Sequence, residues 1–118
     1  MPQRSYRLLP RLRIVDARNT IILGPGKADL LEALARTGSI RDAAKELGMS
    51  YMRAWTLIGI MNDCFREPLV EASRGGSGRG GAKLTKAGKA VLRLYRRMSK
   101  ASEAVSASSF RDLRRLLR

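Results

Sequence analysis

Hydrophobic and polar positions in the first half of the chain alternate with the spacing of amphipathic helices. From Lys27 onward, leucines and alanines recur every three or four residues until Gly38, which predicts a helix that this glycine ends. Ser39 and Asp42 form an S-x-x-D capping box, so a second helix is predicted to begin there and to stop at Gly48.

A third helix is predicted after one tight turn. Ser50 is its candidate N-cap, and the helix should run from about Tyr51 to Phe65. Its apolar row comprises Ala54, Leu57, Ile58 and Met61. Cys64 follows this row, and we expect it to be a small core residue.

The second and third helices meet the steric requirements of a helix-turn-helix. Such a motif needs a small residue where the helices touch and favours glycine in the turn, where φ is often positive. Ala44 and Gly48 satisfy these needs, and Met49 can fill the inside of the turn. The outer face of the third helix would then be free to enter a major groove. An ordinary αα-hairpin, which also favours alanine and glycine, is the alternative.

Short β-rich runs flank the three helices. Leu12–Val15 and Thr20–Leu23 are joined by Asp and Asn turn formers, which predicts an N-terminal β-hairpin. Leu69–Ala72 and Ala82–Leu84 flank the glycine- and arginine-rich residues 73–81, which predicts a second hairpin with a basic tip. The expected fold is α+β, mainly α: a winged helix-turn-helix.

The last third of the chain is predicted to be helical and basic. Thr85 is expected to cap a fourth helix. After a Ser/Ala-rich stretch, Ser109 and Asp112 form another capping box, which predicts a separate short terminal helix. We therefore expect a DNA-binding domain over residues 1–100 and a basic helical extension over residues 101–118.

Charge points to a polyanionic partner. Lys and Arg number 24 against 10 Asp and Glu, and the formal net charge is +14. Residues 74–118 carry 13 basic and only 2 acidic side chains. A nucleic acid fits this excess, because neutralised phosphates release condensed counterions. A protein that is merely basic, or that binds acidic lipid, is the alternative.

Several function classes are disfavoured. The chain has no histidine and one cysteine, which excludes zinc fingers, an intramolecular disulfide and histidine-based triads. Residues 76–81 fit G-x-G-x-x-G, but a strand is expected after them where a dinucleotide site needs a helix. We expect no enzyme activity and no cofactor. No apolar run could span a bilayer and no signal peptide is evident, so a cytoplasmic location is expected.

The candidate DNA-binding residues come from three segments. Arg53 can donate bidentately to guanine or contact only phosphate, and Thr56 can meet a base edge. Trp55 is expected to support the core or groove lining rather than contact a base. The full set is Ser39 and Arg41 at the second helix, Ser50, Tyr51, Met52, Arg53 and Thr56 at the third, and Arg74, Arg79, Lys83 and Lys86 at the wing.

The segments GSIRDAAKELGMSYMRAWTLIGIMN and LVEASRGGSGRGGAKLTKAG resemble the N-terminal DNA-binding domain of molybdate-dependent, ModE-type regulators. The helix-turn-helix is more distantly similar to that of LysR-type regulators. The resemblance covers roughly residues 20–100 and implies a winged-helix homodimer that binds a palindromic operator. In that family the oxyanion binds to C-terminal β-barrel domains. We expect no molybdate sensing by these 118 residues themselves.

Together these features predict a sequence-specific transcriptional regulator that binds double-stranded DNA as a homodimer. Apolar rows on the fourth and terminal helices offer pairing surfaces, since we expect that one small domain does not bury both. Packing of these rows on the chain's own first helix is the alternative to pairing. Two alternatives remain open. One is a nonspecific nucleic-acid-binding protein, architectural or RNA-directed, and the other is a basic module that docks on an acidic protein.

Overall fold

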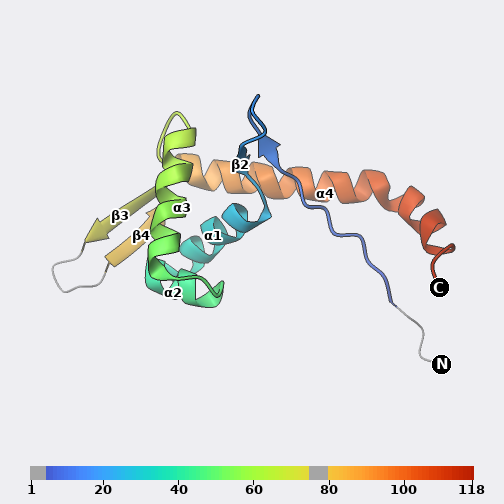
Figure 1. Cartoon of the computed structure of the whole chain (residues 1–118), viewed down its shortest axis with the longest axis horizontal. Coiled ribbons are helices and arrows are strands. Elements are labelled where there is room, and N and C mark those ends of the chain that lie inside the picture. The colour runs from blue at the N-terminus through green and yellow to red at the C-terminus, as the bar shows by residue number, and fades with distance from the viewer. Residues whose placement is uncertain (1–4, 75–79) are drawn as a thin grey trace.

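The computed structural model describes residues 5–74 and 80–118 (Figure 1). Its elements, in chain order, are β1 (Ile14–Val15), β2 (Ile21–Leu23), α1 (Pro25–Thr37), α2 (Ile40–Glu46), α3 (Tyr51–Cys64), β3 (Val70–Arg74), β4 (Gly80–Leu84) and α4 (Lys86–Arg114). β1 pairs with β2 and β3 with β4, both antiparallel. The expected mainly α winged helix-turn-helix fold is confirmed.

The first three helices enclose the core. The α1 leucines Leu30, Leu31 and Leu34 are fully buried, as their spacing predicts. Gly38 ends α1 with a φ of 68°, a left-handed conformation that glycine adopts without strain. The helix begins at Pro25 rather than Lys27, because proline fits the first turn, where its missing N–H would be unpaired in any case.

The turn between α2 and α3 has the expected construction. Ala44 is buried and Gly48 has a φ of 68°. The Met49 N–H donates to the carbonyl oxygen of Ala44 at 3.0 Å, and the Met49 side chain packs against the core. The helix-turn-helix geometry is therefore produced locally, by a small contact residue and a left-handed glycine.

The N-terminal hairpin is shorter than expected but turns as predicted. Asp16 Oδ1 accepts hydrogen bonds from the N–H groups of Arg18 and Thr20, and Asn19 has a φ of 64°. Both are typical of Asp and Asn in tight turns.

The wing is joined to the helix-turn-helix by backbone contacts. β3 and β4 pair from Val70 opposite Leu84 outward. The Ala82 N–H donates to the Gly38 carbonyl oxygen at 3.0 Å, and Ser39 forms a bridge with Gly81. The residues before α2 therefore lie along the free edge of β4.

Two sequence-based expectations are wrong. α4 is one uninterrupted helix of 29 residues, so Ser109 and Asp112 lie inside it and no separate terminal helix begins there. Serine and alanine tolerate helical conformation, and neither glycine nor proline breaks this stretch. Cys64 is exposed, because it is the last residue of α3 and lies where the helix leaves the core.

Candidate nucleic-acid interface

α3 has a buried face and an exposed face. Ala54, Ile58 and Met61 are buried against the core. The opposite side of its first two turns carries the exposed candidates Tyr51, Met52, Arg53 and Thr56. Met52, a large apolar side chain, is 69% exposed. This face is available to a partner molecule, as a recognition helix requires.

The start of α3 is fixed by its cap. Ser50 Oγ accepts a hydrogen bond from the Arg53 N–H at 3.1 Å, which confirms Ser50 as the N-cap. Thr56 Oγ1 donates to the Met52 carbonyl oxygen at 2.9 Å. Thr56 can still accept a hydrogen bond from an amino group of a base through its lone pairs.

Trp55 supports this surface from below. Its ring is half-buried and packs against the core, as expected. It meets the Tyr51 ring edge-on, with centroids 6.1 Å apart and an interplanar angle of 81°. This contact restricts the orientation of Tyr51 on the exposed face.

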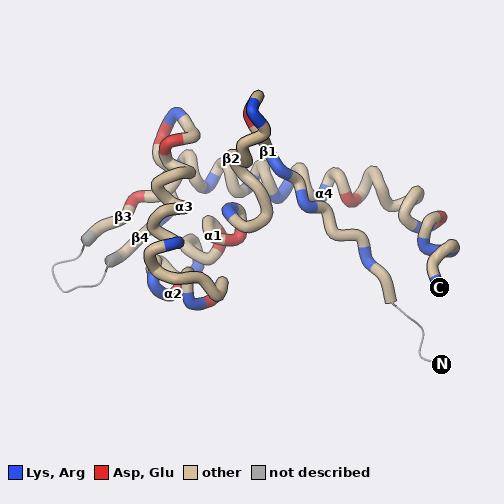
Figure 2. Tube along the Cα trace, viewed as in Figure 1, with Lys and Arg blue, Asp and Glu red and all other residues tan. Residues whose placement is uncertain are grey.

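The start of α2 adjoins the wing. Ser39 Oγ accepts from the Asp42 N–H at 3.1 Å, so the Ser39 cap is confirmed. Arg41 is exposed in the first turn. Figure 2 shows that basic positions of α2 and of the start of α3 gather at the same end of the domain. An Arg36–Glu46 ion pair ties α1 to α2, and the hydrogen bond from Arg36 lowers the pKa of Glu46.

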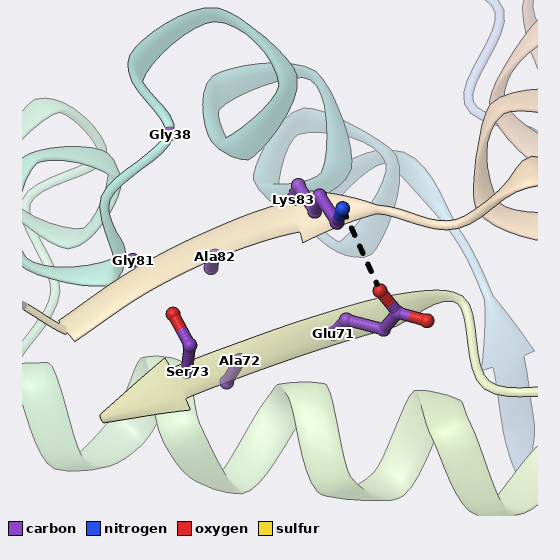
Figure 3. A pocket seen from close by; sticks show the side chains of 7 residues that line it. All are labelled: Gly38, Glu71, Ala72, Ser73, Gly81, Ala82 and Lys83. Atoms are coloured by element: carbon purple, nitrogen blue, oxygen red, sulfur yellow. Dashed lines mark ion pairs between the residues drawn. The ribbon is translucent and has the colours of Figure 1, made fainter. Parts of the chain in front are cut away.

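A cavity of about 640 Å³ lies along the wing (Figure 3). Lys83 and Glu71 face each other across the two strands, with Nζ and Oε2 4.0 Å apart. Both side chains are exposed, so the pair is weak and Lys83 remains able to meet a phosphate. The residues that line the cavity are Gly38, Glu71, Ala72, Ser73, Gly81, Ala82 and Lys83.

The remaining wing candidates are only partly placed. Lys86 is the exposed first residue of α4. The side chain of Arg74 and all of Arg79 lie outside the described residues. The structure therefore brings the start of α2 and the base of the wing together. The arginine side chains toward the tip of the wing are not among the parts that it describes.

Asn62 is a positioning residue that the sequence reasoning missed. Its Oδ1 accepts from the N–H groups of Leu69 and Val70, at 2.8 and 3.1 Å. Its Nδ2 donates to the Val70 carbonyl oxygen at 3.1 Å. One amide therefore satisfies three backbone groups and holds β3 against α3. The only sequence signal is a polar residue next to the buried row of a helix.

Thr85 and Gly88 fix the other end of the wing. Thr85 Oγ1 accepts from the Gly88 N–H at 3.0 Å, which confirms the predicted cap, and donates to the Pro68 carbonyl oxygen at 2.6 Å. A Cβ atom on Gly88 would lie 2.1 Å from the Leu69 carbonyl oxygen. Only glycine allows α4 to pass this close to the start of β3.

The family described as bacterial regulatory helix-turn-helix protein, lysR family, matches residues 27–89. This span runs from α1 through the wing to the first turn of α4. The chain belongs to this family. It carries a helix-turn-helix DNA-binding domain, and the family assignment supports a regulatory protein rather than an enzyme.

Curated relatives of this LysR-type domain confirm the ModE resemblance. Molybdenum-pterin-binding protein MopA of Rhodobacter capsulatus is 47% identical over 70 residues, which are 59% of this chain and 26% of that protein. The DNA-binding transcriptional dual regulator ModE of Escherichia coli K12 is 38% identical over 84 residues, 71% of this chain and 32% of that protein. ModE of Yersinia pestis is 45% identical with the same coverage. The chain spans about a third or less of these relatives' length.

A solved structure shows the same fold. ArgP from Mycobacterium tuberculosis superposes with a TM-score of 0.50 at 18% identity, over 76% of this chain and 30% of that one.

Within residues 5–74 and 80–118, no helix is both long and apolar enough to cross a membrane.

Proposed function

We propose that this LysR-type domain is a sequence-specific transcriptional regulator whose α3 enters the major groove of DNA. The observation that carries the proposal is the exposed face of α3, where Tyr51, Met52, Arg53 and Thr56 lie on the first two turns of a helix that Ser50 caps. A helix held by its buried face presents such side chains to base edges.

The wing and the start of α2 supply the phosphate contacts of this proposal. The bridge between Ser39 and Gly81 brings the start of α2 to the edge of the wing. Arg41 and Lys83 could then bind phosphates of the same DNA strand. Arg74, Arg79 and Lys86 extend the same positive charge along the sequence. Phosphate contacts set the register of the protein on DNA, whereas base contacts set its specificity.

A homodimer fits this role, because one winged helix reads about one major groove and specificity in a genome usually needs two half-sites. In support, α4 leaves Leu94 47% exposed and Met98 42% exposed. Ile14, Val15 and Ile21 of the N-terminal hairpin are exposed apolar residues as well. We place the pairing surface on α4 and this hairpin.

The test of sequence-specific binding is Arg53→Ala. DNA selected by the protein from a random library supplies the specific site, and unselected duplex supplies the comparison. If Arg53 reads a base, the variant should lose about 1–3 kcal/mol on the selected site and little on random DNA. Arg111→Ala, at the distal end of α4, is the control for the loss of one positive charge.

Other results would redirect the proposal. Equal losses on selected and random DNA would make Arg53 a phosphate contact. Equal affinity of the unaltered protein for selected and random DNA would favour a nonspecific nucleic-acid binder. The absence of any DNA shift at physiological salt would favour a module that docks on an acidic protein.

A further inference from the structure

Residues 5–13 form an extended strap that crosses α4 and continues toward the C-terminal end of the chain (Figure 1). Tyr95 Oη of α4 donates to the Leu12 carbonyl oxygen at 2.7 Å. Near the other end, Tyr6 Oη donates to the Arg118 carbonyl oxygen at 2.8 Å. Pro10 favours the extended form, because its ring fixes its own φ and disfavours helix at Leu9. The strap is therefore attached to the helical region at two points far apart in sequence.

Side chains of the strap alternate between the two sides. The half-buried positions are Tyr6, Leu8, Pro10 and Leu12, and the exposed ones are Ser5, Arg7, Leu9, Arg11 and Arg13. This period of two is that of an extended chain with one face on a surface. Three of the five outward side chains are arginines.

The strap arginines are uncompensated. The ion pairs among the described residues use Arg36, Lys83 and Arg96 as their cations, so Arg7, Arg11 and Arg13 have no carboxylate within 4 Å in that part of the chain. The first 13 residues contain no Asp or Glu. An extended chain rises about 3.3 Å per residue, which spaces Arg11 and Arg13 by roughly 7 Å and Arg7 and Arg11 by roughly 13 Å.

We propose that Arg7, Arg11 and Arg13 form a second DNA-contact surface, which binds backbone phosphates of duplex outside the segment that α3 reads. The strap lies outside residues 27–89, which match the helix-turn-helix family. Figure 1 shows it crossing in front of α4, on the same side of that helix as α3. This inference rests on the proposed DNA binding and adds a phosphate contact that the helix-turn-helix does not supply.

Duplex DNA fits the strap better than a membrane surface does. The outward row has one apolar side chain, Leu9, which is 53% exposed, whereas an interfacial membrane anchor needs a broad apolar face. Guanidinium groups at intervals along an extended backbone suit a line of phosphates, to which arginine donates bidentately. A duplex held by α3 would also present its flanks at high effective concentration.

The test compares a strap variant with a charge-matched control on two duplexes. The strap variant is Arg7→Gln, Arg11→Gln, Arg13→Gln, which leaves the inward residues intact. The control is Arg111→Gln, Arg114→Gln, Arg115→Gln at the C-terminal end of α4 and its cap, with the same loss of charge. One random-sequence duplex has about 12 base pairs, little more than one turn, and the other has about 40.

On the long duplex, the strap variant should reduce the slope of log affinity against log salt by about three units, one for each lost phosphate contact. On the short duplex it should match the unaltered protein. The control should change the long-duplex slope by less than one unit. Circular dichroism and thermal melting check that both variants fold.

Three outcomes would overturn the strap proposal while leaving DNA binding intact: an unchanged slope on the long duplex, an equal loss in the control, or an equal loss on both duplexes. Loss of binding to anionic vesicles with unchanged duplex affinity would overturn it in favour of a membrane contact. If the unaltered protein binds neither duplex, the proposed function fails first, and that result is distinguishable from all of these.

Discussion

Gly88 shows how one residue sets the distance between two elements. At Gly88, which is buried, α4 passes the Leu69 carbonyl so closely that an added methyl group has no space. Gly88→Ala should lower the free energy of unfolding by about 1–3 kcal/mol, through a forced backbone shift. Gly59→Ala is the matched control, because nothing lies within 4 Å of a Cβ at this exposed position in α3, and alanine should stabilise the helix by up to about 1 kcal/mol. Urea unfolding measures both, and equal effects would contradict the close approach.

Tyr95 links stability to alkaline pH. Burial raises the pKa of its hydroxyl above the ordinary value, an effect that Arg96 opposes and Asp29 assists. Because the folded state favours the protonated form, this contribution is complete below the unfolded pKa of about 10 and is lost as pH rises through the folded pKa.

The comparison that isolates this effect is Tyr95→Phe. At neutral pH the variant loses the hydrogen bond to Leu12 and should be less stable by about 1 kcal/mol. Above pH about 10 the gap in unfolding free energy should narrow. Only the unaltered protein has a phenol at this position, and its ionisation in the unfolded state favours unfolding. A gap that stays constant between pH 8 and about 11 would contradict the burial argument.

Residues that act on their own neighbourhood were predictable. Ser39, Ser50 and Thr85 were identified as caps, and all three accept the expected backbone hydrogen bond, because a cap acts within one helical turn. The structural roles of Asn62 and Gly88 are not predictable in this way. Each role depends on contact with backbone that is distant in sequence, and the spacing of nearby residues does not indicate such contacts.

At the scale of elements, Asn62 makes the wing part of the domain. Asn62→Leu keeps the side-chain size but leaves two N–H groups and one carbonyl at the start of β3 without their partner. The free energy of unfolding should fall by about 1–3 kcal/mol, the desolvation cost of unpaired backbone groups. Asn62→Asp retains the acceptor for both N–H groups but turns a carboxylate oxygen toward the Val70 carbonyl oxygen, so it should also be less stable than the unaltered protein. Denaturant unfolding ranks the three proteins, and a variant Asn62→Leu as stable as the unaltered protein would refute the role.

The sequence predicted which elements exist better than where they end. Helices α1 to α3 came from strong apolar periodicity and tight glycine turns, and their limits were nearly right. The predicted boundary inside α4 is wrong, because the capping box of Ser109 and Asp112 lies within an unbroken run of helix-compatible residues. The distal half of α4 is mostly exposed, so tertiary packing contributes little there and helix propensity is the main reason that the helix continues.

At the scale of the whole molecule, α4 separates the domain into a packed part and a projecting part. Its proximal half is anchored on α1, where Arg96 pairs with Asp29 and Glu32. Leu94→Arg, on the exposed side, should prevent pairing of two copies and weaken binding to a two-half-site DNA, with the fold retained. Sedimentation at micromolar concentration measures this against the 13.1 kDa single chain. A single-chain mass for the unaltered protein, with and without DNA, would rule the dimer out.

The length of the uninterrupted α4 also bears on the distance between the two α3 helices of a dimer. With 29 residues it is about 43 Å long, comparable to one turn of DNA between half-sites, about 34–36 Å. If two copies join along such stiff rods, the separation and the angular phase of their α3 helices are both fixed before DNA arrives. Half-sites moved apart by half a turn would then face opposite sides of the duplex, whereas a shift by a whole turn would preserve their phase and alter only their distance.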